Sequence, residues 1–192
     1  RNLCTEYNVL MLADEIQTGL ARTGKMLAID HENVHADILI LGKALSGGTL
    51  PVSAVLANDD IMLNIQPGQH GSTYGGNALA CAVALESLKV LEDERLAGNA
   101  AVMGELFRES LNNLNSPFIK TVRGKGLLNA IVVNHVNPEA AWDLCIGLKE
   151  NGLLAKPTHG DKIRFAPPLI ITKEQVLECV DIIGRSLRVL EA

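Results

Sequence analysis

DILILGK, residues 37–43, is a short apolar run that ends in a glycine and a lysine. A similar run, VLMLADE at residues 9–15, ends in two acids. Runs that are apolar on both faces are typical of strands in a covered parallel sheet. Residues 25–31 between them have a helical pattern, so strand, crossover and strand predict an α/β fold. In open α/β sheets the ligand crevice lies beyond the carboxyl ends of the strands, where Asp14 and Lys43 fall.

The composition is that of a globular protein without a basic binding surface. The chain has 192 residues, of which 47% are hydrophobic and 20% are charged, so it can build a core. Its net charge of −5 argues against nucleic acid as a partner, and no apolar run approaches the roughly 20 residues of a membrane helix. Four widely spaced cysteines without nearby histidine pairs predict buried thiols in a reducing compartment and no metal site: Cys4, Cys81, Cys145 and Cys179.

The pattern changes near residue 95, which predicts a second, smaller domain over residues 95–192. Before that point we expect a third strand over residues 51–57 and a long helix over 77–94. The first residues have the pattern of the end of a helix, so we expect the chain to be the C-terminal part of a longer polypeptide. The second part predicts helices over residues 96–114, 138–151 and 173–190, and strands over 119–122, 127–133, 153–156 and 162–166, with a turn at 123–126.

Lys43 and Asp14 are the first candidates for catalysis. Burial of Lys43 among apolar and small neighbours would favour a neutral, nucleophilic amine that condenses with an aldehyde. Asp14 could then pair with a protonated pyridine nitrogen and keep that ring cationic, and Gln17 could bind a ring substituent. A solvated lysine, a turn-capping aspartate and a turn glutamine remain the ordinary alternatives. Three glycines would let the backbone approach a flat ring: Gly42, Gly47 and Gly48.

Two further segments carry candidate binding residues. In HGSTYGGN, residues 70–77, the hydroxyls of Ser72 and Thr73 could bind a phosphate before the long helix or could serve as its N-caps. We expect His70 to be a hydrogen-bonded structural residue. Arg164, in IRFAPP at residues 163–168, lies between apolar neighbours and precedes two prolines. This setting favours a held guanidinium that grips a carboxylate, with a surface ion pair as the alternative.

Five motifs in order resemble those of the class III pyridoxal-phosphate-dependent aminotransferases of fold type I. The resemblance is greatest to the members that act on L-ornithine, and it covers the chain from end to end. Each motif alone is a weak signal, whereas the ordered set is specific. The motifs are ADEIQTGLARTG at 13–24, GKALSGG at 42–48, HGSTYGGN at 70–77, RGKGLLNA at 123–130 and GLLAKPTHGD at 152–161, which leads into RFAPP at 164–168.

The resemblance implies a role for each candidate in binding pyridoxal 5′-phosphate. Lys43 would form the Schiff base with the cofactor and later shuttle the proton. Asp14 would pair with the pyridine nitrogen, and Gln17 would lie by the ring hydroxyl. Thr73, together with Ser72, would contact the phosphate of the cofactor held by a second subunit, which implies a homodimer or a higher oligomer.

The resemblance also implies the reaction and the domains. Residues 1–94 would be the C-terminal part of the mostly parallel-sheet large domain, and residues 95–192 the α+β small domain. Arg164 would bind the α-carboxylate of glutamate or 2-oxoglutarate. The reaction would transfer the δ-amino group of L-ornithine to 2-oxoglutarate, giving glutamate semialdehyde and glutamate. The N-terminal half of the same protein would complete the site, in the cytosol or in the mitochondrial matrix.

Two rival interpretations remain open. An acetylornithine or other class III ω-aminotransferase would share the Asp-Glu and His-Gly-Ser-Thr motifs. A binding subunit that keeps the fold without the chemistry is the second rival, against which the intact Asp14 and Lys43 argue.

Overall fold

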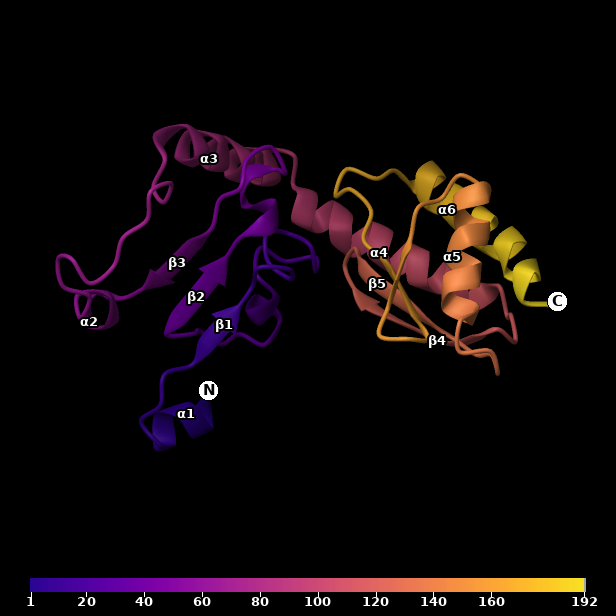
Figure 1. Cartoon of the computed structure of the whole chain (residues 1–192), viewed down its shortest axis with the longest axis horizontal. Coiled ribbons are helices and arrows are strands. Elements are labelled where there is room, and N and C mark those ends of the chain that lie inside the picture. The colour runs from indigo at the N-terminus through magenta and orange to yellow at the C-terminus, as the bar shows by residue number, and fades with distance from the viewer. Residues whose placement is uncertain (192) are drawn as a thin grey trace. The chain divides into compact units, whose positions relative to one another are not determined.

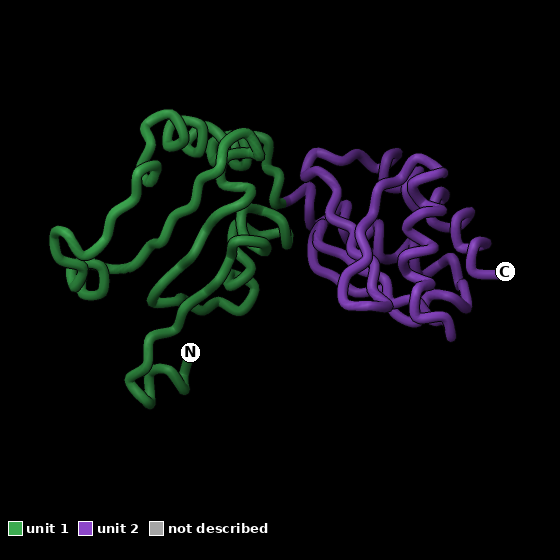
Figure 2. The backbone as a smooth tube through the Cα atoms, in the orientation of Figure 1, with its two compact units in different colours: residues 1–97 green, residues 98–192 purple. Residues whose placement is uncertain are grey.

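The chain divides into two compact units, residues 1–97 and residues 98–192 (Figure 2). The structure is a computed structural model, and it describes residues 1–191. The division lies close to residue 95, where the sequence pattern changes. Each unit contains a sheet of its own, and the α/β class expected from the sequence is confirmed, with sheets that are mixed or antiparallel.

The first sheet has three strands in the order β1-β2-β3, with β2 in the middle (Figure 1). β1 (Leu12–Asp14) runs parallel to β2 (Ile38–Leu41), and β3 (Ala54–Ala57) runs antiparallel to β2. The three apolar runs are therefore strands, although β1 begins three residues later than its run. Within the expected mostly parallel sheet, β1 and β2 are parallel and β3 is an antiparallel strand. The chain between β2 and β3 contains a short 3₁₀ turn and no crossover helix, so β3 returns in the opposite direction.

Short helices and one long helix complete the first unit. α3 (Ala78–Asp93) is the long helix expected after residue 77, and it packs against η2 (Lys43–Ser46). Its buried residues are Ala80, Ala84 and Leu91, whereas Leu79 and Leu85 of the predicted apolar stripe are more than half exposed. The predicted stripe is therefore buried only in part, at Leu91 and, half-buried, at Val83 and Leu88. The remaining elements are α1 (Asn2–Glu6), η1 (Ala28–His31) and α2 (Asp59–Met62).

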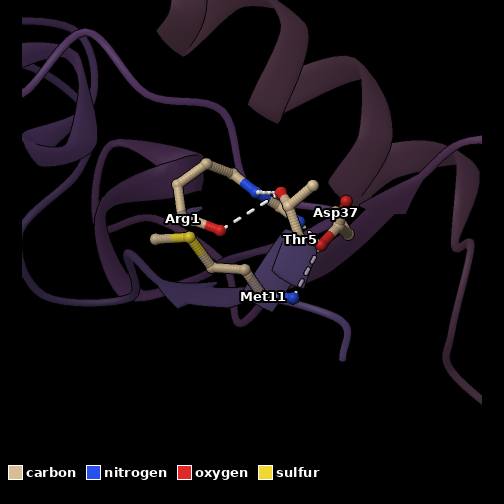
Figure 3. Close-up of polar contacts among 4 residues, drawn as sticks. All are labelled: Arg1, Thr5, Met11 and Asp37. Carbon is tan, nitrogen blue, oxygen red and sulfur yellow. Dashed lines mark hydrogen bonds and ion pairs between the residues drawn. The ribbon is translucent and has the colours of Figure 1, made fainter. Parts of the chain in front are cut away.

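Asp37 ties the start of the chain to the first sheet (Figure 3). Its Oδ2 accepts a hydrogen bond from the Met11 backbone N–H at 2.6 Å and forms an ion pair with Arg1 Nη1 at 2.5 Å. The pKa of Asp37 lies below its usual value, chiefly because of the hydrogen bond from the Met11 N–H and next because of the Arg1 side chain. Asp37 thus links two segments before β1 to the residue that precedes β2.

The second unit is an antiparallel sheet covered by helices, in the order β4-β5-β7-β6. This matches the α+β pattern expected there, with changed boundaries: β4 continues to Lys125, so the turn lies at residues 126–127 and not at 123–126. β6 begins at Lys156 and not at residue 153. The elements are α4 (Leu96–Asn113), which begins in the first unit, β4 (Ile119–Lys125), β5 (Leu128–Val133), α5 (Ala140–Glu150), β6 (Lys156–Thr158), β7 (Lys162–Phe165), α6 (Lys173–Ser186) and η3 (Leu187–Glu191).

Alternate residues of the second sheet build the core of this unit. Ile131 and Val133 of β5 and Ile163 and Phe165 of β7 are buried with the helices. The Phe165 ring meets Phe107 of α4 edge to face, with centroids 5.6 Å apart. Period-two burial assigns one face of the sheet to the core and leaves the other face less buried.

α4 approaches the β4–β5 turn so closely that no side chain fits between them. A Cβ at Gly104 would lie 1.8 Å from the Gly126 carbonyl oxygen. That oxygen accepts hydrogen bonds from Arg108 Nη1 at 2.9 Å and from Asn129 Nδ2 at 3.1 Å. The buried Asn129 amide in turn accepts from Arg108 at 2.8 Å. This network holds the hairpin of the RGKG motif against the helix.

Candidate functional site

Asp14 and Lys43 lie at the carboxyl ends of neighbouring parallel strands, as the sequence predicted. Asp14 is opposite Ile40 in the β1–β2 register, and Lys43 follows the end of β2 by two residues. Asp14 Oδ1 accepts a hydrogen bond from the Ile16 N–H at 3.1 Å, which is the turn-capping role considered for it. Its other oxygen has no partner within residues 1–191. The carboxylate therefore caps a turn and still presents one oxygen to a ligand.

Gln17 is the neighbour that the structure brings to Lys43. Lys43 Nζ donates a hydrogen bond to Gln17 Oε1 at 3.1 Å, and both side chains are exposed. The expectation that Lys43 is buried is therefore wrong for this chain, because its apolar neighbours point away from the amine: Leu41 and Leu45 are buried while Lys43 is not.

The backbone after β2 turns sharply at Lys43. Its φ of 47° lies in the left-handed region, as do those of Gly47 and Gly48, at 62° and 85°. Residues other than glycine rarely take this conformation, and at functional sites it often fixes the direction of a side chain. Gly47 and Gly48 are thus explained by the turns they make. A Cβ at Gly42 would meet Ile16 at an ordinary 3.5 Å, so close packing does not require glycine there.

Glu15 is a buried carboxylate whose role the sequence pattern did not reveal. It is 3% exposed, and its Oε1 and Oε2 accept from the Ile29 N–H at 2.8 Å and the Thr18 hydroxyl at 2.5 Å. It thereby fixes both ends of the loop that carries Gln17. The sequence did contain a signal for the burial of Glu15. Adjacent residues of a strand point to opposite faces, so an exposed Asp14 implies that Glu15 points to the other side.

The same loop contains two strained residues. Leu20 and Ala21 have φ values of 58° and 69°, and they are 3% and 0% exposed. A left-handed backbone costs a non-glycine residue about 1–2 kcal/mol. Their tight packing, together with the Glu15 hydrogen bonds, holds the loop in this conformation.

Ser72 and Thr73 lie in an exposed segment before α3. Ser72 Oγ accepts a hydrogen bond from the Gly75 N–H at 2.8 Å, which closes a turn. Asn77 caps α3 by accepting from the Ala80 N–H at 3.1 Å, so the interpretation of Ser72 and Thr73 as N-caps is wrong. No hydrogen bond within residues 1–191 joins Thr73 or His70 to another residue. Phosphate binding by these hydroxyls remains a prediction.

Arg164 lies in β7 of the second unit, between the buried Ile163 and Phe165. Its side chain is half-buried, and no acid in residues 1–191 forms an ion pair with it. The surface ion pair considered for Arg164 is therefore not present in the described chain, and the guanidinium is available to a carboxylate ligand.

The cysteines differ in their surroundings. Cys145 is buried, which raises its pKa to about 11, whereas Cys81 is exposed. The expectation of four buried thiols is therefore wrong for Cys81. Among residues 1–191 no group of three or more histidines, cysteines or acids could hold a metal ion, and no described helix is long and apolar enough to cross a bilayer.

The family model for the class-III aminotransferases matches residues 1–187. The chain belongs to the class-III aminotransferase family. The resemblance found in the motifs is thereby confirmed.

Named members of the class-III aminotransferases are similar along nearly the whole chain. The ornithine aminotransferases, mitochondrial, of Drosophila melanogaster and Rattus norvegicus are 63% and 60% identical over 187 residues, which are 97% of this chain and 43% of each relative. The crystal structure of acetylornithine aminotransferase from Elizabethkingia anophelis is 59% identical with a TM-score of 0.93, covering 97% of this chain and 50% of that one. The ornithine aminotransferase of Toxoplasma gondii, described with partial occupancy of PLP at its active site, is 50% identical with a TM-score of 0.93, covering 99% and 46%.

These matches also define the share of a class-III aminotransferase that the chain represents. It spans less than half the length of the curated relatives it matches. The comparison structures show that both units have the fold of this family.

Proposed function

We propose that this chain is part of an ornithine aminotransferase that transfers the δ-amino group of L-ornithine to 2-oxoglutarate by means of pyridoxal 5′-phosphate. The observation that carries the proposal is the hydrogen bond between Lys43 and Gln17, which follow the carboxyl ends of two parallel strands, one of which ends in Asp14. Relatives of this name at 60% identity or more support the choice of ornithine. The activity, the substrates and the partners are proposed for the full-length protein.

The donor set fits the cofactor. The Lys43 amine is exposed and can reach an aldehyde. The free oxygen of Asp14 matches a protonated ring nitrogen, and a carboxylate there would raise the pKa of that nitrogen. The Gln17 amide N–H groups, without partners in residues 1–191, could donate to a ring hydroxyl. When bound, pyridoxal phosphate supplies an aldehyde for the substrate amine and a ring that accepts electrons.

Each candidate residue of this chain would then have a separate role in the reaction. Lys43 would act as general base and general acid, moving a proton at its Nζ. Gln17 would orient that amine through its Oε1, and Asp14 would retain the proton of the ring nitrogen. Arg164 would hold the α-carboxylate of 2-oxoglutarate or glutamate by a bidentate ion pair. The hydroxyls of Thr73 and Ser72 would bind the phosphate held by a second subunit, which makes the enzyme a homodimer at least.

Acetylornithine is the second candidate substrate. The observation that favours it is the 59% identity to the Elizabethkingia anophelis structure of that name. The rates of the full-length protein with L-ornithine and with N-acetylornithine distinguish the two, and we expect ornithine to be preferred. Preference for the acetylated amine would overturn the ornithine assignment.

Chemical trapping tests the role of Lys43. Borohydride reduction of the full-length protein with its cofactor, followed by peptide mass spectrometry, is expected to place the added mass on the peptide with Lys43. Lys43→Ala should lose turnover and trapping, whereas Lys89→Ala, at an exposed lysine of α3, should keep both. Turnover in Lys43→Ala would contradict the proposal, and a protein that binds the cofactor without any trapped lysine would support a binding subunit instead.

A further inference from the structure

The face of the second sheet opposite the core carries three cations in one row. Arg123 of β4 is paired in register with Ala130 of β5, which is paired with Arg164 of β7, which is paired with Lys156 of β6. Residues directly opposite in a ladder project to the same face. The neighbours on the strands, such as Ile131 and Ile163, are buried on the core side. The three cations therefore share the open face, with a small alanine between the two arginines.

This cationic row, Arg123, Arg164 and Lys156, has no counter-charge among the described residues 1–191. None of its members forms an ion pair or a side-chain hydrogen bond within residues 1–191. The next row along the same face holds Lys162, which is already paired with Asp161. Like charges directly opposite in a sheet, as for Arg164 and Lys156, are destabilising. An arrangement that costs stability and lacks a partner points to an anionic ligand.

The spacing of the row suits a short dianion. Neighbouring strands lie about 4.7–4.9 Å apart, so Arg164 and Lys156 stem from adjacent positions, while Arg123 stems from two strands away. Long side chains on both sides of Ala130 can converge over its methyl group and meet two carboxylates. L-Ornithine carries two ammonium groups and one carboxylate, so the same row repels it.

We propose that Arg123 and Lys156, together with Arg164, form the recognition surface for the dicarboxylate acceptor and favour it over the cationic amino donor. The proposal rests on the function proposed above and deepens it, because it adds two residues to the assigned Arg164. Arg123 and Lys156 are exposed, so they act mainly by attracting the anion from solution. Their contribution to its affinity therefore falls as the salt concentration rises.

The test uses the full-length enzyme with Arg123→Gln, Lys156→Gln and the matched control Lys149→Gln, an exposed lysine on α5. The measurements are KM for 2-oxoglutarate and for ornithine, and direct 2-oxoglutarate binding by calorimetry at low and high salt. Each row variant is expected to weaken 2-oxoglutarate roughly two- to fivefold and to reduce its salt dependence, as for an exposed charge. KM for ornithine should stay level or fall.

The charge-preserving variants Arg123→Lys and Lys156→Arg keep the test decisive if a glutamine variant folds poorly, since they should restore most of the binding. The inference would be overturned if Arg123→Gln and Lys156→Gln bound 2-oxoglutarate as well as Lys149→Gln does. It would also be overturned if they weakened the binding of 2-oxoglutarate and of ornithine equally. The two proposals fail separately. The unchanged protein could bind 2-oxoglutarate, with weaker binding in Lys156→Gln, and yet not transaminate ornithine. That result would refute the proposed function and would still support the role of the cationic row.

Discussion

The Lys43 amine donates a hydrogen bond of 3.1 Å to the side-chain oxygen of Gln17, beyond the carboxyl ends of the parallel strands of the first sheet. The two residues come from different loops, one after each of the parallel strands β1 and β2. The contact therefore couples the position of the proposed base to the loop that the buried Glu15 fixes.

Removal of the Gln17 side chain is expected to slow the reaction without abolishing it. In Gln17→Ala the Lys43 amine loses its fixed acceptor, and the loss of one hydrogen bond corresponds to a rate decrease of roughly two- to tenfold. Single-turnover kinetics with ornithine measure this effect. Gln17→Glu, which keeps an acceptor oxygen, serves as the comparison. An unchanged rate in Gln17→Ala would show that the contact has no part in positioning the amine.

Glu15 is expected to support stability through its buried carboxylate. Glu15→Ala leaves the part-buried Thr18 hydroxyl and Ile29 N–H without their acceptor, and an unsatisfied buried group costs about 1–3 kcal/mol. Denaturant unfolding of the full-length protein gives the loss. Glu32→Ala, at an exposed acid nearby, should have little effect, and equal stability of the two variants would refute the clamp.

Two glycines of α4 are expected to respond in opposite ways to the same substitution. Gly104→Ala places a methyl group against the Gly126 carbonyl oxygen, so we expect a loss of about 1–3 kcal/mol from overpacking. Gly98→Ala meets no atom within 4 Å, and the better helix propensity of alanine should add roughly 0.5–1 kcal/mol. Thermal unfolding measures both. A neutral Gly104→Ala would mean that α4 and the hairpin separate more easily than their close approach implies.

Asp37 is expected to make stability sensitive to acid. Its pKa in the folded protein is lower than the ordinary 3.8 because the Met11 N–H and Arg1 favour the carboxylate. The contribution is therefore fully present above pH 3.8 and is lost as the pH falls through the lower, folded value. Unfolding curves at a series of pH values should show that Asp37→Asn loses stability at neutral pH and converges with the unchanged protein in acid. The exposed Asp60→Asn is the control; a constant gap at every pH would contradict the linkage.

Local patterns predicted the elements that carry the candidate site. The apolar runs before Asp14 and Lys43 became β1 and β2, and the helical pattern after residue 77 became α3. These features depend on neighbours in sequence. The motif order also predicted the family, because five separate segments agree on one class.

Features set by distant contacts could not be read in the same way. The exposure of Lys43 depends on which atoms surround it, and its apolar neighbours in sequence do not report on that. The position of the β4–β5 turn is linked to Arg108, whose side chain reaches the Gly126 carbonyl from α4. The direction of β3 follows from the connection after Lys43 and not from the apolar content of the strand. The cationic row depends on register, which a single sequence does not specify.

The consecutive left-handed residues Leu20 and Ala21 narrow the substitutions that natural variation can accept in this loop. Glycine would relax the backbone but would leave an empty space where a packed side chain was, and β-branched residues would raise the strain further. Glycine and β-branched substitutions are thus each expected to lower stability, for different physical reasons. We therefore expect saturation mutagenesis to find few tolerated substitutions at Leu20 and Ala21.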